Sequence, residues 1–173
     1  MGVKVTEIKC PEKWESINDW DSHKPALWLV LTNCEDGETF VEFGSGLGST
    51  PFIKEYCEEN VRAFYSFDTD MEWAEKTGAI YIPDFKSLEF NPTPKVLFVD
   101  GKPGEERKDL ISIHKDTPII IAHDTESGAD YVYGMSEILS QFKYRVDYCP
   151  IGKPQTTIIS NKVNIEEWVS RRD

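Results

Sequence analysis

Short apolar runs alternate with amphipathic segments along most of this chain. The runs are too continuous for half-exposed strands and are typical of strands buried on both faces of a sheet. They lie at 40–43, 61–67, 79–82, 95–99, 118–122, 144–149 and 156–160. Segments with helical periodicity separate several of them, at 50–60, 71–77, 105–115 and 131–142. This alternation predicts an α/β fold with a mostly parallel sheet and helices on both faces. The strand positions that we expect to be buried are Val41, Phe43, Phe64, Tyr65, Val96, Phe98, Ile120 and Ile121.

The two ends of the chain follow a different pattern. Residues 11–20 look helical, with Trp14 and Ile17 on one stripe, and residues 25–31 continue as an apolar helix or strand. Residues 165–171 predict a short surface helix. The chain has no internal repeat and no linker-like segment long enough to separate domains. We therefore expect one domain over 1–173, with its core at 38–163 and a C-terminal helix within 164–173.

Residues 40–50 are the most informative segment of the sequence. Three alternate glycines follow an apolar strand, and they allow a sharp turn that comes close to a ligand because no Cβ blocks the approach. Thr50 suits the N-cap of the following helix, and Pro51 suits its first position. A strand, a glycine turn and a helix N-terminus together predict a cofactor-binding turn. Tight packing between the strand and the helix is the alternative explanation.

The glycine spacing narrows the choice of cofactor. The dinucleotide fingerprint needs a third glycine at position 49, where this chain has Ser49. The pattern Glu42-x-Gly44-x-Gly46-x-Gly48 instead resembles motif I of the class I S-adenosylmethionine-dependent methyltransferases. The resemblance implies a three-layer Rossmann-like fold, with a mostly parallel seven-stranded sheet and an antiparallel terminal strand. It also implies that Glu42 lies close to the methionine ammonium and that the turn faces the amino-acid end of the cofactor through Gly44, Ser45, Gly46 and Gly48.

Two acidic residues downstream match further parts of the same resemblance. Asp68 ends the second strand, 24 residues after Gly44, where a carboxylate can accept hydrogen bonds from both ribose hydroxyls. Asp70 instead suits the N-cap of the helix at 71–77. Asp84 follows the third strand, where the resemblance implies a contact with the adenine amino group. A surface turn explains Asp84 equally well.

The next two strands also end in ionisable residues. Asp100 follows the strand at 95–99 and His123-Asp124 follows the strand at 118–122, so we expect the three side chains to meet at one sheet edge. This arrangement resembles cation-dependent O-methyltransferases and implies a divalent metal on Asp100, His123 and Asp124. Magnesium is the ion that the resemblance implies, whereas an imidazole ligand favours zinc, iron or manganese. Two alternatives to metal binding are that His123 acts as a general base and that it only fixes its loop.

The loop after Asp100 departs from the resemblance. The related families place a basic residue three positions beyond the first metal-binding acid, and this chain has Pro103 there. Lys102 is one residue early and can replace that base only if the loop shifts. We therefore expect Asp100, Lys102 and His123 to be the catalytic candidates. Arg107 either binds an anionic group of the substrate or forms a structural ion pair.

Composition restricts the partners and the location. The chain has 31 acidic and 19 basic residues, a net charge of −12, which disfavours polyanions and leads us to expect no nucleic-acid partner. The longest uninterrupted apolar run, 26–31, is far short of the roughly 20 residues that span a bilayer, so we expect no membrane partner. The chain opens without a secretory leader pattern, and its four scattered cysteines suit reduced thiols. These features favour a cytoplasmic protein, and they do not determine the oligomeric state.

The resemblance and the residues lead to one functional prediction with two alternatives. We expect methyl transfer from S-adenosyl-L-methionine to an oxygen of a small molecule such as a sugar or another polyol, with possible help from Mg²⁺ or Mn²⁺. A non-catalytic cofactor- or nucleotide-binding module of the same fold is the first alternative, and a nicotinamide-dependent oxidoreductase is the second. Methyltransferases of this fold often carry an N-terminal helix over the cofactor, so residues 1–37 form either such a lid or a segment whose Trp14, Trp20 and Trp28 pack on the sheet.

Overall fold

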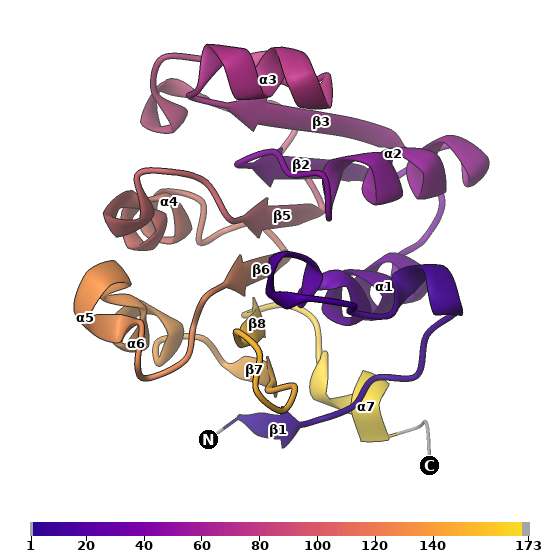
Figure 1. The fold of residues 1–173 in the computed structure, drawn as a ribbon. Helices are drawn as coiled ribbons and strands as arrows, with labels where there is room; N and C mark the ends of the chain where they lie inside the picture. Colours follow the sequence, from indigo (N-terminus) through magenta and orange to yellow (C-terminus); the bar gives the residue numbers. More distant parts are fainter. Residues whose placement is uncertain (1, 171–173) are drawn as a thin grey trace.

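The computed structural model describes residues 2–170, which form one eight-stranded sheet between two layers of helices (Figure 1). The order of the strands across the sheet is β1-β7-β8-β6-β5-β2-β3-β4. In chain order the strands are β1 (Val3–Val5), β2 (Thr39–Phe43), β3 (Ala63–Asp68), β4 (Ile80–Tyr81), β5 (Val96–Val99), β6 (Ile119–His123), β7 (Tyr144–Tyr148) and β8 (Thr156–Ser160).

Every neighbouring pair of strands is parallel except the two pairs that involve β8. β8 lies between β6 and β7 and is antiparallel to both, so the predicted mostly parallel α/β sheet with an antiparallel terminal strand is confirmed. The sheet has eight strands instead of the expected seven, because β1 pairs with β7 along its whole length. Three residues at a sheet edge carry too little periodicity to be recognised in the sequence.

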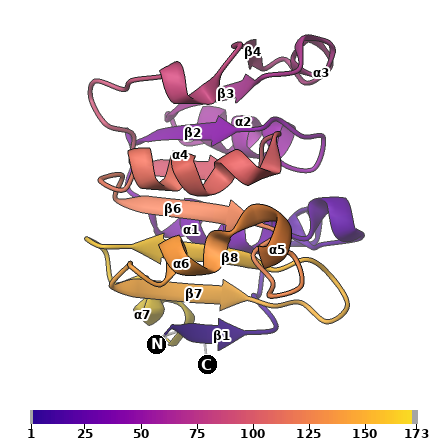
Figure 2. The same ribbon diagram turned by 90° about the vertical axis from the view of Figure 1, so that its left-hand side faces the viewer.

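Helices cover both faces of the sheet. They are α1 (Lys24–Asn33), α2 (Thr50–Glu59), α3 (Met71–Thr77), α4 (Arg107–Ile113), α5 (Asp130–Tyr133), α6 (Met135–Leu139) and α7 (Glu166–Ser170). Figures 1 and 2 show α1, α2 and α7 on one face and α4, α5 and α6 on the other. Neighbouring strand residues point to opposite faces, so Phe40 belongs to the core under α1 and α2, whereas Val41 belongs to the core under α4 and α6.

Several expected elements differ in detail. The segment 131–142 forms two short helices because Gly134 adopts a left-handed conformation, with φ of 60°, between α5 and α6. A 3₁₀ turn at Gly104–Glu106 precedes α4 in place of a continuous helix from residue 105. The N-cap of α2 is Ser49, one residue before the predicted Thr50. The helix predicted at 165–171 is observed as α7, and its last predicted residue lies outside the described part of the chain.

The first half of β3 contradicts the predicted burial. Phe64 is only partly buried and Tyr65 is 47% exposed, whereas the other six predicted strand positions are buried. The reason is the position of β3 next to the short edge strand β4, which pairs only with Phe67 and Asp68. The first residues of β3 are therefore open on one side.

The N-terminal segment packs through one tryptophan and exposes another. Two 3₁₀ turns, Glu12–Trp14 and Asp19–Asp21, take the place of the helix expected at 11–20. Trp14 is fully buried, and its ring packs against Trp28 of α1 and Phe52 and Tyr56 of α2. Trp20 is 86% exposed and does not join this cluster. Among the described residues, no helix has the length and apolar character that crossing a membrane requires.

Candidate functional site at the carboxyl edge of the sheet

The turn after β2 brings two loops into direct contact. Gly44 has φ of 90°, and its N–H donates to the carbonyl of Phe67 at the end of β3. A Cβ on Gly44 would lie 2.1 Å from the Cα of Gly101, in the loop after β5. Both the positive φ and the lack of space therefore require glycine at position 44.

The other two glycines of the turn differ in what surrounds them. A Cβ on Gly46 would meet the Ser49 hydroxyl at 3.2 Å and otherwise has space around it. A Cβ on Gly48 would lie 2.9 Å from the carbonyl oxygen of Trp20, because the N-terminal segment packs on the turn there. The turn is therefore open to a ligand at Gly46 and covered at Gly48.

Glu42 is buried directly beneath the turn. Its side chain is fully inaccessible and accepts hydrogen bonds from the hydroxyls of Ser49, Thr50 (2.7 Å) and Ser66 (2.6 Å). Burial raises the pKa of Glu42 to about 7, although the three hydroxyl donors act in the opposite direction. In this structure Glu42 ties the turn to α2 and β3, and its predicted proximity to a methionine ammonium stays a prediction.

Asp68 lies beside the turn, as the predicted ribose-binding residue must. Its Oδ2 accepts hydrogen bonds from the N–H and the hydroxyl of Ser45, each at 2.8 Å, and its Oδ1 accepts from the N–H of Asp70 at 2.9 Å. Asp70 itself caps α3 through the N–H of Trp73. A carboxylate has about four acceptor sites, so the ribose diol fits only if the Ser45 hydroxyl turns away from Asp68.

Asp84 does not join this group in the described structure. Its side chain is exposed and accepts a hydrogen bond from the N–H of Lys86, which caps the 3₁₀ turn Phe85–Ser87. This is the geometry of the surface-turn alternative. A contact of Asp84 with adenine stays a prediction that nothing in the described contacts tests.

An open cleft of about 730 Å³ lies at the carboxyl edge next to β3 and β5. Its size is within the range of small-molecule sites, roughly 300–1,000 Å³. The cleft is lined by Thr69, Asp70, Lys102, Pro103, Gly104, Glu105, Arg107 and Tyr133. Lys102 is exposed here, and its carbonyl oxygen accepts a hydrogen bond from the hydroxyl of Thr69. No described contact brings the Lys102 ammonium to Asp100 or His123.

The ends of β5 and β6 bring the other predicted residues together. Nδ1 of His123 lies 3.3 Å from Oδ1 of Asp100 and 3.5 Å from Oδ1 of Asp124. Arg107, at the start of α4, forms ion pairs with Asp100 (3.1 Å) and Asp124 (3.0 Å) and donates to the carbonyl oxygens of Asp100 and Gly101. Arg107 is therefore a structural clamp between the two loops, and its pairing with Asp100 was not expected from the sequence.

The charges in this cluster shift the pKa values of its members. Burial alone would lower the pKa of His123, but the carboxylates of Asp100 and Asp124 outweigh it and raise that pKa. Burial alone would raise the pKa of Asp100, but His123 and Arg107 lower it. The pair therefore favours a charged imidazolium beside a carboxylate when no other ligand is present.

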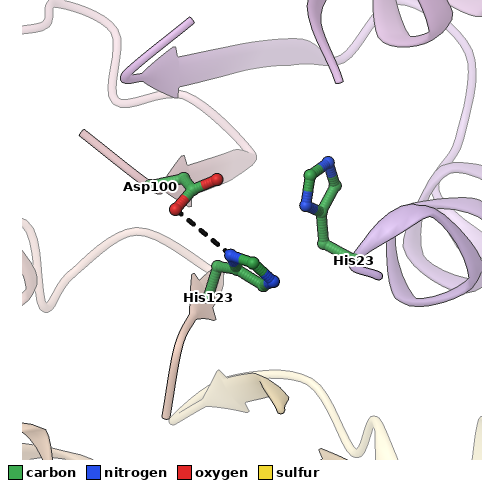
Figure 3. A group of neighbouring side chains, drawn as sticks. All are labelled: His23, Asp100 and His123. Carbon is green, nitrogen blue, oxygen red and sulfur yellow. Dashed lines mark hydrogen bonds and ion pairs between the residues drawn. The ribbon is translucent and has the colours of Figure 1, made fainter. Parts of the chain in front are cut away.

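Two residues that the sequence analysis did not select complete the cluster. The Ser22 hydroxyl lies 2.8 Å from Nε2 of His123, and the His23 ring lies next to that of His123, with 4.9 Å between their centroids. Figure 3 shows His23 facing Asp100 and His123 from the start of α1. Burial lowers the pKa of His23 to about 4, so the ring is neutral. The only available signal was a polar run, 21–24, directly before the apolar helix.

Known proteins resemble this chain in structure but not detectably in sequence. No family model matches the chain, and no curated protein sequence matches it. Solved structures do match. A precorrin-6y C5,15-methyltransferase from Geobacter metallireducens GS-15 has a TM-score of 0.54 and 13% identity, with 91% of this chain and 95% of that chain covered.

Two further similar structures are a tRNA methyltransferase and an rRNA methyltransferase. The B. subtilis m1A22 tRNA methyltransferase TrmK has a TM-score of 0.51 and 13% identity, covering 80% of this chain and 65% of that chain. The T. thermophilus 16S rRNA N2 G1207 methyltransferase, in complex with AdoMet and guanosine, has a TM-score of 0.50 and 12% identity, covering 79% of this chain and 38% of that chain.

These structures correct one prediction from the sequence. The expectation of a small-molecule acceptor and no nucleic-acid partner is contradicted, because similar structures include tRNA and rRNA methyltransferases. The physical reason is that net charge describes the whole surface, whereas phosphate binding depends on the local distribution of charge. The resemblance to small-molecule O-methyltransferases is likewise not supported beyond the broader superfamily. The strand order, the glycine turn and these similar structures together show that the chain has the fold of the class I S-adenosylmethionine-dependent methyltransferases.

Proposed function

We propose that this chain is an enzyme that binds S-adenosylmethionine and transfers its methyl group to an acceptor. The observation that carries the proposal is the hydrogen bond from the N–H of Ser45 to Asp68, 2.8 Å long. This hydrogen bond joins the turn that contains Gly46 to the acid at the end of β3. A cofactor with an amino-acid end and a ribose needs the turn for the first and the acid for the second. S-adenosylmethionine supplies an activated methyl group when bound.

The residues of this chain fit the cofactor in part. Gly46 has free space for close approach, and Asp68 has one acceptor site left for a ribose hydroxyl. The cleft that begins at Thr69 and Asp70 adjoins this acid and gives room for the rest of a ligand. Rotation of the Ser45 hydroxyl away from Asp68 is the local change that full ribose binding requires.

Asp100 and His123 are the residues that we propose for proton transfer at the acceptor. Asp100 is held by Arg107 and His123 is held by Ser22, so both side chains have fixed orientations. His123 takes the proton that the acceptor loses on methylation only in its neutral form, because the imidazolium favoured beside Asp100 has no free nitrogen lone pair. The exposed Lys102 lies in the cleft and is a third candidate for acceptor binding.

The proposal is tested by calorimetric titration of the full chain with S-adenosylmethionine, with NAD as the comparison ligand. Gly46→Val should weaken S-adenosylmethionine binding at least about tenfold, because the branched side chain fills the space over the turn. Gly128→Val is the matched control, since a Cβ at Gly128 meets nothing within 4 Å. Asp68→Ala should also weaken binding, through the loss of the ribose acceptor.

Transfer itself is measured with methyl-labelled S-adenosylmethionine offered with RNA, protein and small-molecule fractions of a cell extract. The proposed methyltransferase is supported if wild type transfers label to one fraction and Gly46→Val does not. Tight binding without transfer to any fraction would favour the non-catalytic module. Absence of S-adenosylmethionine binding would refute the proposed methyltransferase.

A further inference from the structure

His23 is a buried histidine whose ring has no hydrogen-bond partner among the described residues. The residue is 2% exposed, and both Nδ1 and Nε2 lack a partner. The backbone of Gly48 is near enough to influence the pKa of His23, but it does not reach hydrogen-bond geometry with either nitrogen. The ring packs against Phe98 and His123 instead. Burial of a polar group without a partner is unfavourable, so the unpaired ring points to a partner that is not part of the polypeptide.

The neighbours of His23 are the side chains that a metal ion would need. His23, Asp100 and His123 each offer one ligand atom, and these atoms all lie within 4.8 Å of one another. Figure 3 shows them converging from the start of α1 and the ends of β5 and β6. We propose that His23, Asp100 and His123 form a binding site for one divalent transition-metal ion, of the zinc or iron(II) type.

The distances are compatible with such an ion. With bonds of roughly 2.0–2.1 Å, two ligand atoms of a tetrahedral zinc site lie roughly 3.3 Å apart. Nδ1 of His123 and Oδ1 of Asp100 are 3.3 Å apart. The ligand atoms all lie within 4.8 Å of one another, so the ligand atom of His23 has to move closer by at most roughly 1.5 Å to reach this spacing. Three protein ligands leave one position for water or a substrate atom.

The surroundings of His123 favour its role as a ligand. Its Nε2 lies 2.8 Å from the Ser22 hydroxyl. When Nε2–H donates to that hydroxyl, the lone pair of Nδ1 faces the side where Asp100 lies. Metal-binding histidines usually donate their other ring N–H to a fixed acceptor in this way. Ser22 is fully buried, so its hydroxyl is held in place.

The charge of the cluster also suits a cation. The carboxylates of Asp100 and Asp124 outnumber the single guanidinium of Arg107, so the group is negative when both imidazoles are neutral. Arg107 lies 3.1 Å from Oδ1 of Asp100 and competes for that oxygen. Figure 3 shows the other oxygen of Asp100 on the side of His23, so the carboxylate presents one oxygen toward each histidine.

The ligand set differs from the one expected from the sequence. Asp124 has φ of 55° and its Oδ2 is engaged by Arg107, whereas His23 has both ring nitrogens available. Two imidazoles and one carboxylate favour zinc, iron(II) or cobalt over magnesium, which prefers oxygen ligands. The site shares Asp100 and His123 with the proposed proton transfer, but its geometry involves no atom of S-adenosylmethionine and does not depend on cofactor binding.

The test uses the full chain after treatment with a chelator and its removal. Titration with Co²⁺ should give one ion per chain and the visible absorption of a four-coordinate site. Zn²⁺ should displace the Co²⁺, and Mg²⁺ should not. His23→Asn and Asp100→Asn should each lower the Co²⁺ affinity at least about 100-fold. Even the loss of a residue that hydrogen-bonds to a metal ligand lowers metal affinity roughly 10–100-fold. His114→Asn is the matched control, since it removes the remaining histidine, which packs on Phe43 and Phe90.

Three results would overturn the inference. In the first, the wild-type protein does not bind Co²⁺ at one ion per chain. In the second, Mg²⁺ displaces Co²⁺ at the same concentration as Zn²⁺ does. In the third, His114→Asn and His23→Asn lose the same amount of Co²⁺ affinity. If His23→Asn does not fold, Asp100→Asn decides the test, because Asp100 is partly exposed and the change keeps its shape. S-adenosylmethionine binding is titrated on the same samples, so failure of the metal site and failure of the cofactor site are distinguished.

Discussion

Nη1 of Arg107 donates to Oδ2 of Asp124 across 3.0 Å, although the two residues belong to α4 and to the loop after β6. The same guanidinium binds the carboxylate and the carbonyl oxygen of Asp100 and is almost completely buried. One side chain therefore holds the ends of β5 and β6 together at the candidate site.

We predict that Arg107→Met destabilises the fold by about 3–5 kcal/mol, because it leaves two carboxylates without their buried partner. The free energy of unfolding in urea measures this change. Lys13→Met is the control, since Lys13 forms an exposed pair with Glu55, and its loss should cost less than about 1 kcal/mol. Equal effects of the two substitutions would contradict the clamp.

Glu42 should make the stability depend on pH. Its pKa is about 7 in the folded protein against 4.5 for a free glutamate side chain, so the folded state holds the proton more tightly. That stabilisation is complete below about pH 4.5 and is lost as the pH rises toward 7, by about 3 kcal/mol in all. Glu42→Gln keeps the shape and cannot ionise.

The free energy of unfolding of wild type and Glu42→Gln is therefore compared from pH 4 to pH 8. We expect the stability of the variant relative to wild type to increase over this range, because only wild type must ionise a buried group. All other titrating groups cancel in the difference. A difference that stays constant with pH would show that folding does not shift the pKa of Glu42.

The contact between Gly44 and Gly101 predicts a severe effect of Gly44→Ala. The new Cβ would lie 2.1 Å from a backbone atom, so the turn or the loop after β5 has to move. We expect a loss of more than about 3 kcal/mol, with the positive φ responsible for roughly 1 kcal/mol. Gly37→Ala separates the two causes, because Gly37 has φ of 79° and open space. Thermal unfolding of both variants measures the difference.

The aromatic cluster predicts a large effect for one tryptophan of the N-terminal segment and almost none for another. Trp14→Ala should destabilise the protein by about 3–5 kcal/mol, because it leaves a cavity among Trp28, Phe52 and Tyr56. Trp20→Ala should change the stability by less than about 0.5 kcal/mol, since its side chain is 86% exposed. Chemical unfolding followed by fluorescence is suitable, and a large loss in Trp20→Ala would contradict the observed packing.

Local features of the chain were predictable because their causes are local. Alternating apolar runs and helical segments indicated the α/β layers, and the glycine spacing indicated the turn after β2. The helix 71–77 and its cap Asp70 were predicted with their observed bounds, because an N-cap depends on residues only three positions apart. The meeting of Asp100, His123 and Asp124 followed from the rule that parallel strands end at one edge.

The sequence by itself determined every strand except β1, as well as the glycine turn and the acids at the strand ends. Only the tertiary structure decided which groups from distant segments meet them. His23 and Ser22 reach His123 because α1 packs against the sheet beneath them, and Arg107 reaches Asp124 because α4 starts beside β6. Such contacts depend on how whole elements pack, and residue periodicity carries no information about the distance between elements far apart in the chain. For the same reason β1, whose three residues gain their hydrogen bonds from β7, was visible only in the folded protein.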